Sequence, residues 1–217
     1  MGQPVLHPFF GPVHAESQQT LSLPRMPRRS PAFRRRATRD RVSSAMRLRA
    51  VAFDLGHTLM DECRDRDVPI DARAVHLMPG VSDVLPHMTV PLAVWANTRL
   101  AAETEVRRWL DRAGLGRLFH WVITSVDAGI RKPAPEFFQY ALARCGLAKD
   151  DLLVVGNQLN TDIAGAETSG IRTVWLSGPA YRSDDDAPSN ASPTYIIQTL
   201  YDLPALLQRV SPQRTEH

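Results

Sequence analysis

Short apolar runs alternate with stretches of helical periodicity through most of this 217-residue chain. The apolar runs are rich in Val, Ile and aromatic residues and have the length of buried strands; they cover Leu48 to Leu55, Leu92 to Ala96, Trp121 to Thr124, Leu152 to Gly156, Thr173 to Leu176 and Tyr195 to Gln198. The intervening periodicity predicts helices over Val81 to Met88, Ala101 to Ala113, Pro135 to Cys145, Thr161 to Ser169 and Leu203 to Leu207. Strand followed by helix, repeated, predicts an α/β fold in which a parallel sheet is covered by helices on both faces.

The first 45 residues differ in kind from the rest of the chain. They are rich in Pro, Arg, Ser and Gln and show no hydrophobic period, so we expect them to be disordered. Residues 1–49 hold ten arginines and two acidic residues, whereas the remainder holds 16 basic and 21 acidic ones. A targeting leader, a basic tail for anionic polymers and a stretch upstream of the natural start at Met46 all fit this composition. We expect a leader over 1–45, one folded domain over 46–210 and a tail over 211–217.

Composition excludes several classes of protein. An apolar fraction of 43% is typical of a globular chain, and no apolar run approaches the roughly 20 residues of a membrane-spanning helix. The mildly acidic folded part argues against nucleic acid as its partner. Two cysteines, Cys63 and Cys145, are too few for a disulfide framework and indicate a reducing compartment. We therefore expect a cytoplasmic protein, unless the leader directs it to an organelle.

Polar residues follow four of the predicted strands, either directly at the strand end or, for Lys132 and Asp162, after a connecting segment. In chain order they are Asp54 with Gly56, His57 and Thr58, then Asn97, then Lys132, then Asn157 with Asp162. Because the carboxyl ends of parallel strands share one edge of a sheet, these side chains should meet there. An acid directly after apolar Phe53 is costly to bury without purpose, which makes Asp54 a candidate nucleophile and Lys132 its candidate partner. Asn157 and Asp162 could serve this site or equally cap the helix that follows them.

The same four segments resemble the haloacid dehalogenase (HAD) superfamily. They read Phe53-Asp54-Leu55-Gly56-His57-Thr58-Leu59, Val94-Trp95-Ala96-Asn97-Thr98, Gly129-Ile130-Arg131-Lys132-Pro133-Ala134-Pro135, and Val155-Gly156-Asn157 with Asp162-Ile163-Ala164-Gly165-Ala166. The resemblance extends over about residues 48–207 and implies a three-layer α/β/α, Rossmann-like domain. Many family members insert a helical cap after the first segment, but residues 59–77 leave no room for one. We therefore expect an open site, from which a large substrate, a partner chain, the short charged flap within residues 59–77 or a second copy of the protein excludes water.

The resemblance also implies a chemistry. Asp54 would attack the phosphoryl group of a small molecule, or an exposed phosphate of a larger one, to form an aspartyl-phosphate that water then hydrolyses. Lys132 would neutralise negative charge, and Thr58 and Asn97 would orient the loop and bind the phosphoryl oxygens. Mg²⁺ would be held by Asp54, the Gly56 carbonyl, Asn157 and Asp162.

Three positions depart from the family pattern. Gly56 replaces the second aspartate that protonates the leaving group, Ala96 replaces a hydroxyl residue, and Asn157 replaces an aspartate. We therefore expect reduced phosphatase activity and weaker Mg²⁺ binding, with His57 as the nearest substitute proton donor. One alternative is a degraded family member that binds a ligand without turnover. Another is a 2-haloacid dehalogenase, which also uses an aspartate nucleophile and needs no metal, but which the missing cap disfavours.

Overall fold

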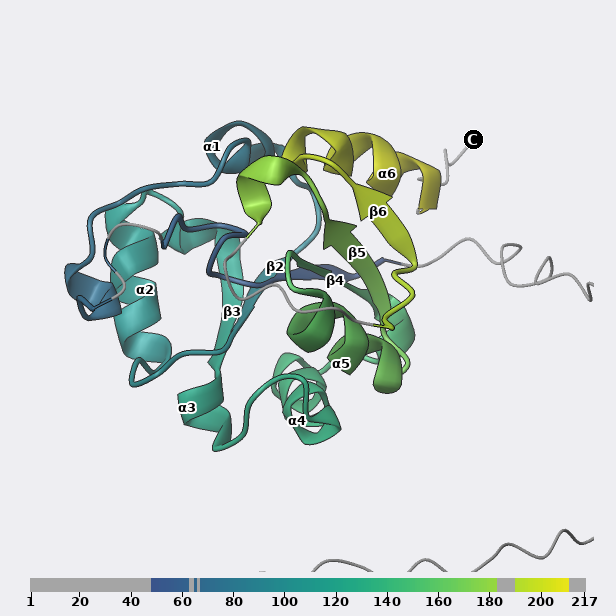
Figure 1. The fold of residues 1–217 in the computed structure, drawn as a ribbon, viewed down its shortest axis with the longest axis horizontal. Coiled ribbons are helices and arrows are strands. Elements are labelled where there is room, and N and C mark those ends of the chain that lie inside the picture. The colour runs from purple at the N-terminus through teal and green to yellow at the C-terminus, as the bar shows by residue number, and fades with distance from the viewer. Residues whose placement is uncertain (1–47, 63–64, 66, 183–189, 211–217) are drawn as a thin grey trace, which may run out of the picture. The chain divides into compact units, whose positions relative to one another are not determined.

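A six-stranded sheet with the order β3-β2-β1-β4-β5-β6 forms the centre of the molecule, and every neighbouring pair of strands is parallel (Figure 1). The structure is a computed structural model that describes residues 48–62, 65, 67–182 and 190–210. The predicted leader over 1–45 and tail over 211–217 lie outside these described residues. The strands are β1 (Ala50–Phe53), β2 (Leu92–Ala96), β3 (Phe119–Thr124), β4 (Leu152–Gly156), β5 (Arg172–Leu176) and β6 (Tyr195–Ile197).

α-Helices lie between successive strands from β1 to β5, and a last α-helix follows β6; between β5 and β6 the described residues contain only a 3₁₀ turn. The α-helices are α1 (Val81–Val84), α2 (Glu103–Arg112), α3 (Ser125–Ala128), α4 (Pro135–Cys145), α5 (Ala164–Thr168) and α6 (Leu203–Val210). Short 3₁₀ turns occur at η1 (Ile70–Ala72), η2 (Leu85–His87), η3 (Gly116–Leu118), η4 (Lys149–Asp151), η6 (Pro179–Tyr181) and η7 (Leu200–Asp202), and η5 (Leu159–Ile163) is a π-helical turn. Within the described part of the chain, no helix has the length and apolarity needed to cross a bilayer.

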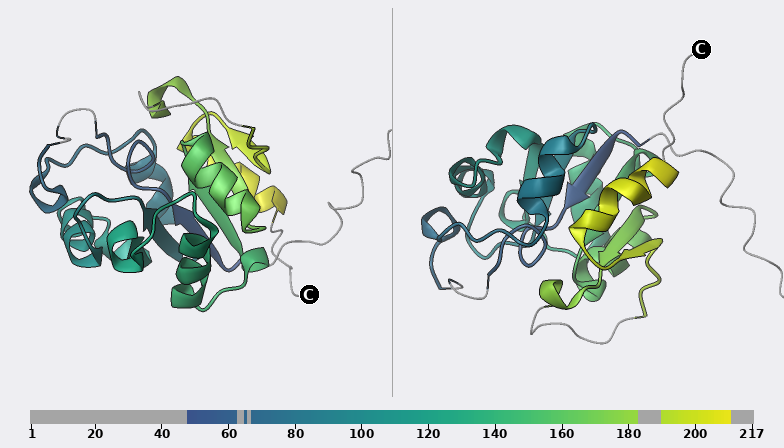
Figure 2. Two further views of the ribbon diagram at one scale, coloured as in Figure 1. Left: turned by 60° about the horizontal axis from the view of Figure 1, so that its bottom comes forward. Right: turned by 90° about the horizontal axis from the view of Figure 1, so that it is seen from above.

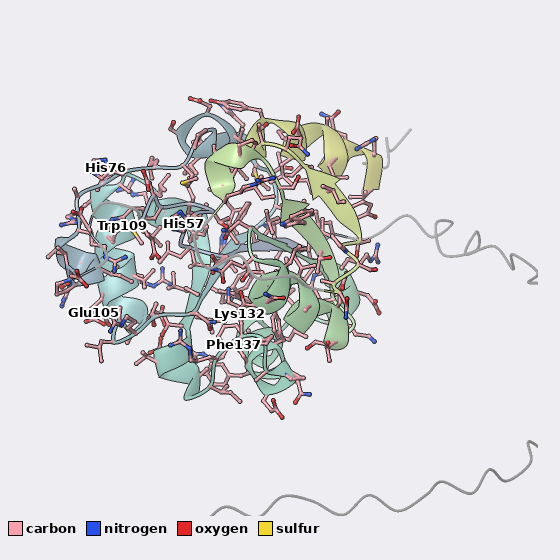
Figure 3. All side chains as sticks on the ribbon, viewed as in Figure 1. His57, His76, Glu105, Trp109, Lys132 and Phe137 are labelled. Atoms are coloured by element: carbon pink, nitrogen blue, oxygen red, sulfur yellow. The ribbon has the colours of Figure 1, made fainter. Side chains whose placement is uncertain are left out.

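The sheet is buried on both faces, as a fully covered parallel sheet must be. Alternate β1 residues point to opposite sides: Val51 and Phe53 pack in one core with α1, α2 and α6, while Ala50 and Ala52 pack in another with α4 and α5. Figure 2 shows these two helical layers from two further directions. Trp109 of α2 and Phe137 of α4, labelled in Figure 3, belong to the two different cores. The predicted three-layer α/β/α architecture is confirmed.

The strand order reverses between β1 and β4, and we call the site at the carboxyl ends of these two strands the crevice. The chain runs outward from β1 through β2 to β3 and then returns to add β4 on the other side of β1. In a sheet of this kind the carboxyl ends of the two strands that flank the reversal form a natural binding crevice. Asp54 follows β1 and Asn157 follows β4, so the topology places both residues at this crevice.

Besides small shifts at the ends of several strands and helices, three elements differ in kind from the sequence-based prediction. The predicted helix over Val81 to Met88 is helical only to Val84 and continues as the 3₁₀ turn η2, because Pro86 has no amide hydrogen for the α-helical ladder. The predicted helix over Thr161 to Ser169 is the π-helical turn η5 followed by α5. The short α3 was not predicted; it starts where the Thr124 hydroxyl accepts a hydrogen bond from the Asp127 amide.

The segment of residues 59–77, which follows β1, lies against α2. Its described part contains the turn η1 but no helical cap. An antiparallel bridge joins its two ends, Met60 and Leu77. Two α2 side chains hold its backbone: Arg112 donates to the Arg73 carbonyl, and Trp109 Nε1 donates to the Ala74 carbonyl at 3.5 Å. The segment is therefore fastened to the body of the domain.

Candidate active site

Three charged side chains from distant parts of the chain meet at the crevice. Lys132, which precedes α4, donates through Nζ to Asp54 Oδ1 at 2.7 Å and to Asp162 Oδ1 at 2.7 Å. Its third hydrogen bond goes to the Trp95 carbonyl of β2, also at 2.7 Å. An ammonium group has three donors, so Lys132 is fully satisfied in this position. The structure thus brings together the candidate nucleophile and its candidate partner.

Because the cluster is buried, its charged groups strongly affect the pKa values of Asp54 and Lys132. The side chains of Lys132 and Asp162 are 2% and 1% exposed, whereas that of Asp54 keeps 12% of its surface. Burial and the nearby Asp162 carboxylate raise the pKa of Asp54 to about 7, against the opposing effect of Lys132. Burial alone would lower the pKa of Lys132, but the two carboxylates outweigh it and the pKa is raised. Lys132 therefore stays protonated, and Asp54 is the carboxylate of the pair that reaches solvent.

Asn97, at the end of β2, holds the backbone of Lys132. Its side-chain Nδ2 donates to the Lys132 carbonyl at 2.9 Å, and the Lys132 amide donates to Asn97 Oδ1 at 2.8 Å. The neighbouring Thr98 is buried, and its hydroxyl donates to the Ala101 carbonyl. The resemblance implied that Asn97 orients the loop and binds the phosphoryl oxygens. In the structure its amide holds the backbone of Lys132, and its binding of phosphoryl oxygens stays a prediction.

Thr58 and Asn157 connect the loops after β1 and β4. The Thr58 hydroxyl donates to Asn157 Oδ1 at 3.2 Å, and Asn157 Nδ2 donates to the Tyr181 carbonyl at 2.9 Å. Neither side-chain atom of Asn157 caps the following turn η5, whose N-cap is Gln158. Of the two readings left open by the sequence, the structure excludes a capping role for Asn157.

Asp162 folds back onto the end of β4. Its Oδ2 accepts from the Gln158 amide at 3.0 Å while Oδ1 faces Lys132. A Cβ atom on Gly156 would lie only 2.4 Å from Asp162 Oδ2, so the glycine makes room for this carboxylate. Gly156 has no positive φ, so the requirement for glycine comes from this contact. The sequence assigned no role to Gly156, because the residue pattern does not show that a side chain at position 156 would collide with Asp162.

Gly56 and His57 form the bend of the loop after β1. His57 has a φ of 54° and is 5% exposed. Its Nε2 is buried and has no hydrogen-bond partner among the described residues. The space beside Gly56 is filled by the Glu62 carboxylate, whose carbon lies 2.7 Å from where a Cβ on Gly56 would be. Sequence reasoning missed Glu62, since nothing in the pattern of residues 59–77 indicates its path.

The oxygen atoms at the crevice fit a hard divalent cation by their chemistry. Asp54 and Asp162 bring two carboxylates close enough for one to raise the pKa of the other, and a cation between such groups would relieve that repulsion. Within the described residues, no group of three or more His, Cys, Asp or Glu side chains could hold a metal ion. Any cation here would therefore depend on amide and carbonyl oxygens to complete its ligand set.

Comparison with known proteins supports the fold and the family resemblance. A family model described as HAD-hydrolase-like matches residues 129–203, which include Lys132, Asn157 and Asp162. A solved structure of an uncharacterized protein from Listeria monocytogenes superposes with a TM-score of 0.64 at 26% identity, covering 75% of this chain and 98% of that chain. The magnesium-bound HAD-hydrolase YfnB from Bacillus subtilis shares the fold, with a TM-score of 0.59 at 19% identity and coverages of 74% and 99%.

A similar curated sequence is the glyceraldehyde 3-phosphate phosphatase of Methanopyrus kandleri. It is 34% identical over 128 residues, which are 54% of this chain and 54% of that protein. The chain spans about half the length of the curated relatives it matches. Both the fold and the sequence comparisons agree with the haloacid dehalogenase-like hydrolase family that the four site segments resemble.

Proposed function

We propose that this chain hydrolyses phosphomonoesters through an aspartyl-phosphate formed on Asp54. The observation that carries the proposal is the 2.7 Å contact between Asp54 Oδ1 and Lys132 Nζ at the mouth of the crevice, where Asp54 alone of the cluster keeps contact with solvent. A carboxylate beside a fixed ammonium group is suited to attack a dianionic phosphoryl group, because the cation offsets the repulsion between the two anions. The Methanopyrus relative, named as a phosphatase of a small phosphate ester, supports a phosphorylated small molecule as substrate.

Each neighbouring residue has a defined task in this proposal. An Asp54 oxygen attacks phosphorus and the bond to the leaving oxygen breaks, while Lys132 remains protonated and stabilises the added negative charge. Asn97 keeps Lys132 in place through its two backbone hydrogen bonds. Thr58 ties the nucleophile loop to Asn157. Water then attacks the phosphorus of the intermediate and releases phosphate and Asp54.

Mg²⁺ is the proposed cofactor. Asp54, Asp162, the Asn157 amide oxygen and the Gly56 carbonyl would hold it, and when bound it would neutralise charge on the transferring group. An amide at position 157 supplies an oxygen but no charge, so the affinity for Mg²⁺ should be lower than that of a site with a third carboxylate. The proposed activity is accordingly modest.

The proposed setting is a cytoplasmic enzyme with an open crevice. The described part of residues 59–77 has no helical cap, so a large substrate, a partner or a second copy of this chain would exclude water from the crevice. His57 is the proposed proton donor to the leaving oxygen. This role requires His57→Asn to slow hydrolysis of an alkyl phosphate much more than that of 4-nitrophenyl phosphate, whose leaving group needs little protonation; equal losses would exclude it.

The test of the proposed function compares the wild-type protein with Asp54→Asn. Both are incubated with Mg²⁺ and 4-nitrophenyl phosphate, and then with a panel of small phosphate esters. We expect turnover by the wild type and a loss of at least a thousandfold in the variant, on the order of the loss seen when a covalent nucleophile is removed. Equal rates in the two proteins would contradict the proposal.

Binding without turnover is the second candidate function. The uncharged amide of Asn157 favours it, because a weaker cation site could abolish catalysis while leaving a phosphate-binding crevice intact. Tight binding of a phosphate ester by calorimetry, without release of inorganic phosphate over hours, would support this candidate. Release of chloride from 2-chloropropionate would instead indicate dehalogenation.

A further inference from the structure

The Glu62 carboxylate packs beside Gly56 in the loop that follows Asp54, in the space that a side chain at position 56 would occupy. The Glu62 carboxyl carbon and its two oxygens lie 2.7, 2.8 and 3.0 Å from the point where a Cβ on Gly56 would be. Gly56 has no positive φ, so its backbone does not require glycine. The absence of a side chain at position 56, two residues beyond Asp54, therefore makes room for the acidic group of Glu62.

Glu62 is held there by a buried arginine. Arg73 Nη1 donates to Glu62 Oε1 at 3.0 Å, and Arg73 Nε donates to the Val68 carbonyl at 2.8 Å. The Arg73 side chain is 10% exposed and that of Glu62 is 29% exposed. Arg112 of α2 in turn donates to the Arg73 carbonyl. Glu62 is thus fixed in orientation but still open to water.

The proposed two-step reaction needs a group that accepts a proton from the attacking water. Lys132 cannot accept one, because its ammonium group already donates three hydrogen bonds. Asp162 uses one oxygen for Lys132 and the other for the Gln158 amide. Asp54 itself carries the phosphoryl group at this stage. Glu62 is a carboxylate outside this cluster that is both fixed at the nucleophile loop and exposed to solvent: its side chain is 29% exposed, whereas His57, the proposed donor of the first step, is only 5% exposed.

We infer that Glu62 is the general base of the second step, in the space that Gly56 leaves free; this inference rests on the proposed function. The oxygen of water attacks phosphorus, its proton passes to the Glu62 carboxylate, and the bond between phosphorus and the Asp54 oxygen breaks. Inorganic phosphate leaves, Asp54 regains its carboxylate, and Glu62 returns its proton to solvent. Arg73 acts as a positioning residue that keeps the Glu62 carboxylate beside the loop.

The first experiment separates the two steps. Glu62→Gln keeps the size of the side chain but cannot accept the proton, so the first step should proceed and the second should slow by about 10²-fold or more. With 4-nitrophenyl phosphate in rapid mixing, we expect a burst of nitrophenol equal to the enzyme concentration, followed by a slow steady rate. Asp67→Asn is the matched control, since Asp67 is an exposed acid of the same segment, and it should behave as wild type.

The second experiment exchanges the two positions. In the wild type, a side chain at position 56 would collide with the Glu62 carboxylate, so Gly56→Asp alone should lower activity. Glu62→Ala should also lower activity. The double variant Gly56→Asp with Glu62→Ala places a new carboxylate in the vacated space. Its rate should be at least tenfold higher than that of Glu62→Ala. The recovery is measured on the second step, as the steady rate after the burst, because a new acid at position 56 could also speed the first step. A purely structural role of Glu62 as the partner of Arg73 would give no recovery of the second step, because the double variant still lacks that ion pair.

The outcomes distinguish this inference from the proposed function. Turnover that requires Asp54 but is unchanged in Glu62→Gln, or a Glu62→Gln rate lowered without a burst and without recovery in the double variant, would overturn the role of Glu62 alone. A wild-type protein whose activity equals that of Asp54→Asn would overturn both. Melting temperatures within a few degrees of wild type are checked for each variant, and if Glu62→Gln does not fold, the double variant decides.

Discussion

Asn97 and Lys132 are joined by two hydrogen bonds of opposite direction. The Asn97 amide nitrogen donates to the Lys132 carbonyl at 2.9 Å, and the Lys132 amide donates to Asn97 Oδ1 at 2.8 Å. The end of β2 therefore fixes the backbone from which the Lys132 ammonium group reaches two carboxylates. A small displacement of that backbone would move the Lys132 ammonium group relative to Asp54, which lies 78 residues away in the sequence.

Asn97→Ala removes both of these hydrogen bonds. We expect a loss of about 1–3 kcal/mol in the free energy of unfolding, at about 0.5–1.5 kcal/mol for each bond. We expect kcat to fall by about 10²-fold because Lys132 is misplaced. Denaturant unfolding and steady-state kinetics measure the two effects. A variant with unchanged kcat would show that Asn97 does not position the lysine.

The raised pKa of Asp54 predicts how stability depends on pH in the protein without metal. Its pKa lies near 3.8 in the unfolded chain and about 7 in the folded one, so the folded state binds this proton more tightly. The contribution of Asp54 to stability is therefore present below about pH 4 and is lost as the pH rises toward 7. In EDTA, the melting temperature of the wild type should fall over this interval relative to that of Asp54→Asn. Parallel curves for the two proteins would contradict the raised pKa.

Asn157→Asp separates cation binding from stability. The new carboxylate adds a charged ligand, so Mg²⁺ should bind at least several-fold more tightly by calorimetry. The same change removes the donor to the Tyr181 carbonyl, so in EDTA the variant should melt at a lower temperature than the wild type. Weaker Mg²⁺ binding in the variant would place the cation away from Asn157.

Gly156→Ala tests the packing of Asp162. The added methyl group would stand 2.4 Å from Asp162 Oδ2 and push the carboxylate away from Lys132. We expect a destabilisation of about 1–3 kcal/mol together with a large loss of activity. The control is Gly114→Ala, where φ is 72° and no atom lies within 4 Å of the added group. It should lose about 1–2 kcal/mol from the backbone conformation but keep its activity. Equal activities in the two variants would show that the position of Asp162 is unimportant.

The meeting of Asp54 with Lys132 follows from the sequence because strand positions determine it. Val51, Ala52 and Phe53 identify a buried strand, and in a parallel sheet the residues after such strands share one edge. The same reasoning predicted that Asn157 and Asp162 lie at this edge, where they contact Thr58 and Lys132. The start of α4 was also predictable, since Pro135 suits a first helical turn and the apolar pattern continues to Cys145.

The partners of individual polar groups could not be predicted in this way. An asparagine after a strand can bind a ligand or a neighbouring backbone with the same amide, and only the distance from Asn97 to Lys132 decides. Glu62 lies in a segment without hydrophobic periodicity, whose path depends on Arg112 and Trp109 of a later helix. Its contact with Gly56 arises from tertiary packing that leaves no local pattern.

Chemical trapping of Asp54 tests the central claim most directly. The wild-type protein is mixed with Mg²⁺ and a small phosphate ester, quenched in acid within a single turnover and digested, and the peptide containing Asp54 is weighed by mass spectrometry. A phosphoryl group on Asp54, absent from Asp54→Asn and accumulating in Glu62→Gln, is the predicted result. Release of phosphate in the wild type with no phosphoryl group on Asp54 at any quench time would contradict it.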